Sequence, residues 1–237
     1  MDNKPHDNDV QQLALPLRLM AGASFDNFFG ESNRKPVAIL EQMLTQRRDF
    51  FSYVYGPEGT GKTHLLCAAC QFSGSGLRVI YLPLRDVTGN LADCLQGVED
   101  FDLVCIDDID KVAGHRDHEV ALFNLYNRLK DAGHQLIVSA QVPPAALRVV
   151  MPDLLSRLSW GVVLPLKELD DQEKSEALKR RAAETGVELA DEVISFIMRR
   201  SNRTLHELFD LFERLDEAAY KAQRRITVPF VKEILGW

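Results

Sequence analysis

A single eight-residue stretch limits what this chain can fold into. Residues 56–63 read Gly-Pro-Glu-Gly-Thr-Gly-Lys-Thr, which matches the pattern GxxxxGK[ST] at every fixed position. The compact aromatic and β-branched run 50–55 precedes it, and the helical segment HLLCAACQF follows it. A strand, a glycine-rich turn and a helix in this order direct several backbone N–H groups toward one point, which suits phosphate oxygens. The stretch therefore predicts an α/β fold with a phosphate-binding loop.

Each position of this loop has an expected role. The glycines let the backbone turn its N–H groups toward the phosphates of a nucleotide. Lys62 is expected to reach the β- and γ-phosphates, and Thr63 to hold Mg²⁺. The expected nucleotide contacts are Gly56, Pro57, Glu58, Gly59, Thr60, Gly61, Lys62, Thr63 and the adjoining His64.

Two aspartates end the apolar segment DLVCIDD, a strand expected at 102–108. The carboxyl end of a parallel strand is where such sheets bind ligands, so Asp107 is expected to orient Mg²⁺ or its water. Asp108 has two interpretations. It is either a catalytic base that polarises the attacking water, or a solvated carboxylate or helix cap.

Strands and helices alternate up to about residue 169, and only helices follow. The expected strands span 50–55, 78–84, 102–108, 135–140 and 162–166. Alternation of this kind predicts a parallel sheet covered on both faces. The expected carboxyl-terminal helices span 171–185, 190–200, 204–223 and 228–235. The predicted organisation is a tail at 1–22, an α/β domain at 23–168 and a small helical lid domain at 169–237.

Composition excludes several classes of protein. The 28 Lys and Arg against 35 Asp and Glu give a net charge of −7, which is unfavourable for neutralising phosphates over a nucleic acid. No apolar run approaches the roughly 18 residues of a membrane span.

The pair Cys67 and Cys70 lies in a predicted helix without a second pair, so small buried residues are favoured over a metal or redox site. Free cysteines and no signal sequence favour the cytoplasm. His115 and His118 are expected to be solvated loop residues.

Several motifs together resemble one family. The loop, the aspartate pair and an all-helical carboxyl-terminal part look like an AAA+ module. The segments FDNFF…SN, LVCIDDID, LYNRL, PDLLSRLSWG and RITVPFVKEIL resemble the bacterial replication initiator DnaA, over residues 24–235. The sequence stops at Trp237, where DnaA continues into a helix-turn-helix domain. The chain therefore resembles the Hda family of DnaA homologues, which inactivate DnaA.

The resemblance implies further site residues. PDLLSRLSWG places Arg157 at the position of an arginine finger, which acts in a neighbouring subunit's nucleotide site. The alternative is a surface arginine in an ion pair worth at most about 1 kcal/mol. Gln141 and Val142 replace an Asp-Arg pair, and His206 replaces a γ-phosphate-sensing arginine for which Arg203 is a possible substitute. These departures predict bound ADP (or ATP) with Mg²⁺ and weak or no intrinsic ATPase activity.

The amino-terminal tail contains one apolar segment, QLALPL, in polar surroundings. It is similar to the hexapeptide by which such proteins bind the DNA polymerase III β sliding clamp. Pro16 limits the entropy lost on docking, Gln12 suits a pocket rim, and leucines suit apolar pockets. The alternative is that the tail packs on its own domain. The expected clamp contacts are Gln12, Leu13, Leu15, Pro16 and Leu17.

The resemblance implies a negative regulator of replication initiation. Tethered to the DNA-loaded clamp, it would stimulate ATP hydrolysis by DnaA in trans and contact DNA only indirectly. A self-sufficient AAA+ ATPase of the helicase-loader type is the alternative, and it would need neither the clamp segment nor DnaA. A DNA-binding initiator is disfavoured by the net charge and by the lack of a helix-turn-helix segment. Self-association into a homo-oligomer stays open.

Overall fold

A five-stranded parallel sheet forms the centre of the α/β part of the described chain. The computed structural model describes residues 22–47, 49–72, 76–201 and 204–237, so the segment Gln12–Leu17 and Arg203 lie outside the described residues. The strand order is β2-β3-β4-β1-β5, and all pairs are parallel. The strands are β1 (Phe51–Tyr55), β2 (Val79–Pro83), β3 (Leu103–Asp107), β4 (Gln135–Ala140) and β5 (Val162–Pro165).

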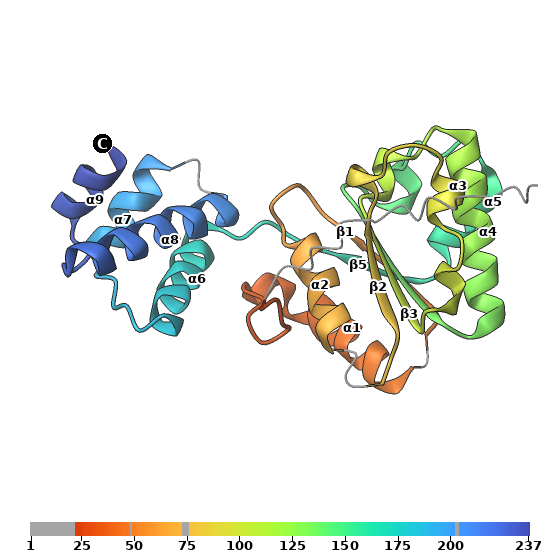
Figure 1. Cartoon of the computed structure of the whole chain (residues 1–237), viewed down its shortest axis with the longest axis horizontal. Coiled ribbons are helices and arrows are strands. Elements are labelled where there is room, and N and C mark those ends of the chain that lie inside the picture. The colour runs from red at the N-terminus through yellow and green to blue at the C-terminus, as the bar shows by residue number, and fades with distance from the viewer. Residues whose placement is uncertain (1–21, 48, 73–75, 202–203) are drawn as a thin grey trace, which may run out of the picture.

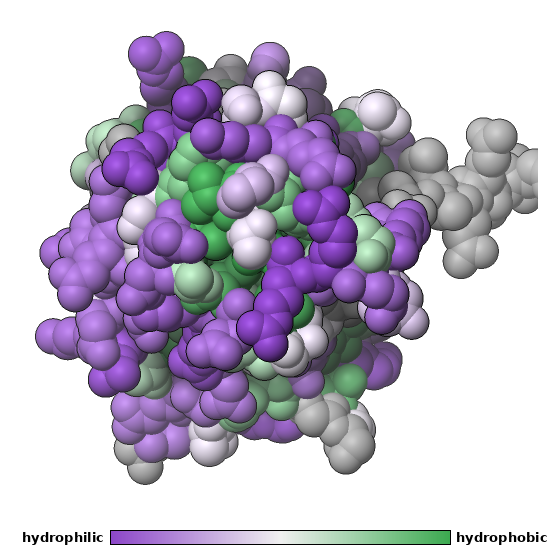
Figure 2. Space-filling model, turned by 90° about the vertical axis from the view of Figure 1, so that its left-hand side faces the viewer, coloured by the Kyte–Doolittle hydropathy of each residue, from purple (hydrophilic) through white to green (hydrophobic). Residues whose placement is uncertain are grey.

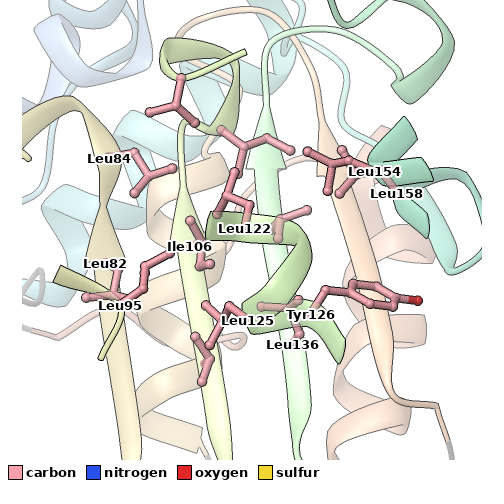
Figure 3. Packing of buried hydrophobic residues seen from close by; sticks show 14 of the residues in the cluster. Leu82, Leu84, Leu95, Ile106, Leu122, Leu125, Tyr126, Leu136, Leu154 and Leu158 are labelled. Carbon is pink, nitrogen blue, oxygen red and sulfur yellow. The ribbon is translucent and has the colours of Figure 1, made fainter. Parts of the chain in front are cut away.

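Helices cover both faces of this sheet (Figure 1). On one face lie α1 (Arg34–Gln46) and α2 (Lys62–Phe72), and on the other lie α3 (Leu91–Cys94), α4 (Arg116–Ala132) and α5 (Pro152–Ser159). Side chains alternate along β3 as the period of a strand requires: Val104 and Ile106 join the α4 side, whereas Leu103 and Cys105 join the α2 side. Figure 3 shows Ile106 among Leu122, Leu125 and Leu136 on the α4 side.

The carboxyl-terminal part is entirely helical among its described residues and has its own core. Its helices are α6 (Asp171–Glu184), α7 (Asp191–Arg200), α8 (Leu205–Ala222) and α9 (Val228–Leu235). Leu178, Ile197 and Phe212 are fully buried in that core. Asp170 caps α6, and with Glu173 it forms a capping box. Viewed from this end, the surface is mostly hydrophilic with apolar side chains near the centre (Figure 2). The predicted parallel sheet followed by a helical lid is confirmed.

The segment before α1 joins the lid to the sheet. The Asn33 side chain donates to the Lys167 carbonyl at 2.9 Å and accepts from its N–H at 2.8 Å, just after β5. Phe29 meets Phe209 of α8 edge-on, with ring centroids 5.7 Å apart. Arg180 of α6 donates to the Asp26 carbonyl at 3.0 Å. The lid is therefore anchored to the chain that leads into α1.

The structure places the two histidines expected in a loop and the cysteine pair of the sequence. His115 is exposed and precedes α4, but His118 lies in the first turn of α4 with a buried ring Nδ1, so its interpretation as a solvated loop histidine is wrong. Helix α4 begins at Arg116, so His118 lies within the helix and not in the loop before it. Cys67 and Cys70 lie on α2 and form no disulfide, and the described residues contain no group of three or more His, Cys, Asp or Glu side chains that could hold a metal ion. None of the described helices is long and apolar enough to cross a membrane.

Candidate functional site

The loop between β1 and α2 has the geometry that phosphate binding needs. A Cβ atom on Gly56 would lie 2.5 Å from the Leu166 carbonyl oxygen, so only glycine fits there. Gly59 and Gly61 have φ angles of 81° and 89°, in the left-handed region that favours glycine. The loop therefore depends on three glycines and leads into the amino terminus of α2, where backbone N–H groups attract anions.

Lys62, the first residue of α2, lies inside this loop. Its side chain is buried, and its Nζ donates to the carbonyls of Gly56 and Pro57 at 2.8 Å each. Burial lowers the pKa of Lys62, while the carboxylates of Asp107 and Asp108 oppose that shift. The ammonium group is thus held at the centre of the loop and close to the acidic edge of the sheet.

Asp107 at the end of β3 is a fully buried carboxylate held by three hydroxyl groups. Thr63 Oγ1 donates to its Oδ2 at 2.6 Å, and the Tyr81 hydroxyl donates to the same oxygen at 2.8 Å. Ser139 Oγ of β4 donates to Oδ1. Three elements therefore fix the orientation of Asp107, and Thr63 and Asp107 present adjacent oxygen atoms of the kind that Mg²⁺ prefers.

Asp108 is not the solvated carboxylate that one of its two interpretations expected. Its φ of 59° is left-handed and its side chain is 7% exposed. It is the N-cap residue of the short helical turn that follows, but its side chain makes no capping hydrogen bond. Arg85, after β2, donates from Nε to Asp108 Oδ2 at 2.5 Å. Burial raises the pKa of Asp108 and Asp107 adds to the rise, whereas Arg85 opposes it. The Asp108 carboxylate is therefore neither solvated nor a capping acceptor, because Arg85 holds it at the sheet edge.

The segment 24–28 lies beside the loop. His64 Nε2 is 2.9 Å from Asn27 Oδ1 and 3.2 Å from the Ser24 carbonyl. Phe28 meets the His64 ring edge-on at 5.6 Å, and a Cβ atom on Gly61 would lie 2.9 Å from the Phe28 ring. Burial lowers the pKa of His64, and the hydrogen bond to Ser24 opposes that shift. The aromatic ring of Phe28 thus borders the loop on this side.

The residues that replace the expected γ-phosphate sensors lie in two places. Gln141 follows β4, and its N–H donates to Asp110 Oδ1 at 3.1 Å, while the Val142 carbonyl accepts from the Tyr53 hydroxyl at 2.9 Å. His206 lies in the first turn of α8 with its side chain 78% exposed, 3.4 Å from Asp210. Contact of Gln141 and His206 with a bound nucleotide stays a prediction.

Comparison with known proteins places the chain in a family. Residues 19–165 match the model of the bacterial DnaA ATPase domain. The chain belongs to this DnaA family. Residues 171–235 match the Hda lid domain, so the protein is a DnaA-homologous, Hda-like AAA+ protein, and the two matches support a role as a DnaA-related replication regulator.

Solved structures agree with the DnaA fold. Domain III of Thermotoga maritima DnaA superposes with a TM-score of 0.79 at 22% identity, over 92% of this chain and 98% of that chain. The AMPPCP-bound DnaA of Aquifex aeolicus gives 0.72 at 26%, over 84% of this chain and 66% of that chain. The Holliday junction branch migration motor RuvB of Thermotoga maritima gives 0.69 at 23%, over 92% and 73%. The first and third likenesses concern the fold alone.

Arg157 of this DnaA homologue lies on α5, away from the loop. Leu154 and Leu158 of α5 join the core on the α4 face of the sheet, whereas Leu65 of α2 joins the core on the opposite face. The guanidinium carbon of Arg157 is 5.9 Å from the centroid of the Tyr126 ring, and no carboxylate of the described residues forms an ion pair with it. Within the residues that the structure describes, Arg157 therefore does not form the ordinary ion pair that was its alternative role.

Sequence reasoning missed several residues of this DnaA-like site. Tyr81, Ser139 and Arg85 surround the aspartates, and Phe28 borders the loop. Hydroxyl-bearing residues inside otherwise apolar strands were the available signal for Tyr81 and Ser139, because a buried hydroxyl needs a partner. Arg85 carried no such signal, since arginines after strands are common at surfaces.

Proposed function

We propose that this protein is a nucleotide-bound regulator that inactivates DnaA by stimulating its ATP hydrolysis in trans. The observation that carries the proposal is the position of Arg157, on the opposite face of the sheet from Lys62 and without an ion-pair partner among the described residues. An arginine so placed is free to enter the nucleotide site of another AAA+ molecule. The experiment is ATP turnover by DnaA in the presence of this protein, the sliding clamp and DNA.

The nucleotide site fits ADP with Mg²⁺. The backbone of Gly56–Gly61 and the ammonium group of Lys62 would hold the phosphates. Thr63 and Asp107 offer a hydroxyl and a carboxylate 2.6 Å apart as ligands for Mg²⁺ or its water. Bound Mg²⁺ neutralises phosphate charge. Asp108 is held by Arg85 at 2.5 Å, an arrangement that restrains the candidate base and accords with weak intrinsic hydrolysis.

ADP is expected to bind at least as tightly as ATP, because Gln141, Val142 and His206 stand where γ-phosphate sensors are expected. Replacing Lys62 with alanine should weaken the binding of both nucleotides by about 10- to 150-fold, since a charge-assisted hydrogen bond contributes about 1.5–3 kcal/mol. Titration calorimetry measures both affinities. Lys35→Ala, an exposed lysine of α1, is the matched control and should bind as the parent does. A strong preference for ATP would exclude an ADP-bound regulator.

The sliding clamp is the proposed tether. Two proteins in dilute solution rarely meet in a productive pose, and binding to one clamp raises their effective concentration. The segment Gln12–Leu17 is the proposed contact. Its role depends on the family resemblance and on its apolar residues, because it lies outside the residues that the structure describes.

The surface beside Arg157 has a feature that suits docking of DnaA. Trp160 at the end of α5 is 78% exposed, and the Lys130 ammonium lies 5.7 Å from its ring centroid. Exposed tryptophans are frequent anchors of interfaces, where truncation costs about 2 kcal/mol or more.

Trp160→Ala is therefore expected to raise the protein concentration that gives half-maximal stimulation of DnaA by about 30-fold, with little change in the maximal rate. The measurement is a titration of DnaA turnover against this protein. Tyr220→Ala on α8 is the control, because Tyr220 is 77% exposed but lies in the lid. Equal titration curves for the two variants would exclude Trp160 as an anchor.

A further inference from the structure

Glu119 in the first turn of α4 is a buried carboxylate that binds backbone only. Its residue is 0% exposed. Oε1 accepts from the N–H groups of Gly114 at 2.8 Å and Val150 at 3.0 Å, and Oε2 accepts from Met151 at 2.8 Å and Val150 at 3.1 Å. Burying a carboxylate is costly unless its oxygens are hydrogen-bonded, and here both are. The side chain therefore joins the turn before α4 to the turn before α5.

This contact fixes the start of α5. Met151 is the N-cap residue of α5, and its own side chain makes no capping hydrogen bond. Glu119 instead holds the Met151 N–H, one residue before the helix begins. Because α5 has only eight residues, the position of its first turn determines where Arg157 lies.

A second residue of α4 holds the other end of α5. Tyr126 follows Glu119 by seven residues, which places both on one face of the helix. The Arg157 guanidinium packs over the Tyr126 ring at 5.9 Å, and Phe50 and Phe51 meet that ring edge-on at 4.9 and 5.3 Å. Figure 3 shows Tyr126 on α4 facing the side of the core to which Leu154 and Leu158 of α5 belong.

We propose that Glu119 and Tyr126 are positioning residues for Arg157. Glu119 sets the start of α5 and Tyr126 supports the guanidinium, so that α4 orients the finger from two points before DnaA binds. The inference rests on the proposed function of Arg157. Orientation matters in such a site, because a misplacement of about 1 Å costs about 100-fold in rate.

The test for Glu119 is Glu119→Gln, which keeps the size of the side chain but turns an amide toward the backbone N–H groups. At saturating protein, DnaA turnover should fall at least about tenfold, with the half-maximal concentration and ADP affinity close to the parent. Leu44→Ala, a buried leucine of α1 on the opposite sheet face, is the control for lost stability and should stimulate normally well below its melting temperature. Parental turnover by Glu119→Gln would overturn the assignment.

Tyr126 has a sharper pair of variants, and these keep the proposal testable if Glu119→Gln does not fold. Tyr126→Phe retains the ring face beneath the guanidinium and should stimulate as the parent does. Tyr126→Leu fills the core but removes the ring and should lower the maximal rate at least about tenfold. Equal maximal rates for the two variants would contradict a positioning role for Tyr126.

Hydrogen exchange gives a readout that does not depend on DnaA. The amides of Val150 and Met151 donate to Glu119, so their exchange should rise at least about tenfold in Glu119→Gln and stay unchanged in Leu44→Ala. Unchanged exchange at these amides in Glu119→Gln would overturn the anchoring.

Arg157→Ala in the same turnover assay distinguishes a failure of the proposed function from a failure of the positioning role. If Arg157→Ala stimulates DnaA normally, the proposed function fails. If Arg157→Ala is inactive while Glu119→Gln and Tyr126→Leu match the parent, only the positioning role fails.

Discussion

Arg157→Ala is expected to remove the stimulation of DnaA ATP hydrolysis almost completely, by about 10³–10⁵-fold in rate. That factor corresponds to roughly 4–7 kcal/mol of transition-state stabilisation, far more than a surface ion pair contributes. The arginine acts only as charge develops on the phosphate oxygens of the partner's ATP. Its guanidinium rests on the Tyr126 ring without an ion pair to any described residue, so the variant should keep its fold, its nucleotide and its clamp binding.

Arg157→Lys sharpens this prediction. Lysine keeps the positive charge but lacks the planar fork of donors that a transferring phosphate requires, so it should recover little of the rate. The measurement is single-turnover hydrolysis by ATP-bound DnaA with each variant at saturating concentration. Stimulation by either variant at the parental level would show that Arg157 is not the finger, and the mechanism would then rest on another residue or on sequestration of DnaA.

Replacing Leu15 and Leu17 together with alanine is expected to weaken binding to the sliding clamp by about 10²–10⁴-fold. Each leucine that fills an apolar pocket contributes about 1.5–3 kcal/mol, and each 1.4 kcal/mol is tenfold in affinity. Calorimetry or surface-based binding to the isolated clamp measures the loss. The thermal midpoint should stay unchanged, because the proposed contacts are with the clamp.

Leu19→Ala is the matched control for this prediction, since Leu19 lies two residues beyond the hexapeptide. It should bind the clamp as the parent does. A lower thermal midpoint with clamp binding intact in the double variant would favour the alternative, in which the leucines pack on the protein's own domain.

The positions of the strands along the chain and the phosphate loop could be predicted because their signals are local. The run at 50–55 and the segment at 102–108 are short, apolar and β-branched, and β1 and β3 lie within them. The glycines of the loop and the position of Asp107 follow from one motif and one strand end. Sequence therefore located the loop and the first aspartate.

The surroundings of these residues could not be predicted, because they depend on contacts between distant segments. Tyr81 and Ser139 meet Asp107 from 26 and 32 positions away, across neighbouring strands. Glu119 resembles an ordinary acidic residue in the first turn of a helix, and it is buried only because the turn before α5 folds over it. Strand register and tertiary packing determine such contacts, and local periodicity predicts neither of them.

The central claim is that this protein makes DnaA hydrolyse ATP, and that the clamp on DNA permits it. The most direct measurement is ATP turnover by DnaA with this protein, the clamp and DNA, omitting one component at a time. The account predicts rapid turnover only in the complete mixture, with loss of stimulation when this protein, the clamp or DNA is left out. Turnover by this protein at the same rate without DnaA would contradict the account and favour a self-sufficient ATPase of the helicase-loader type.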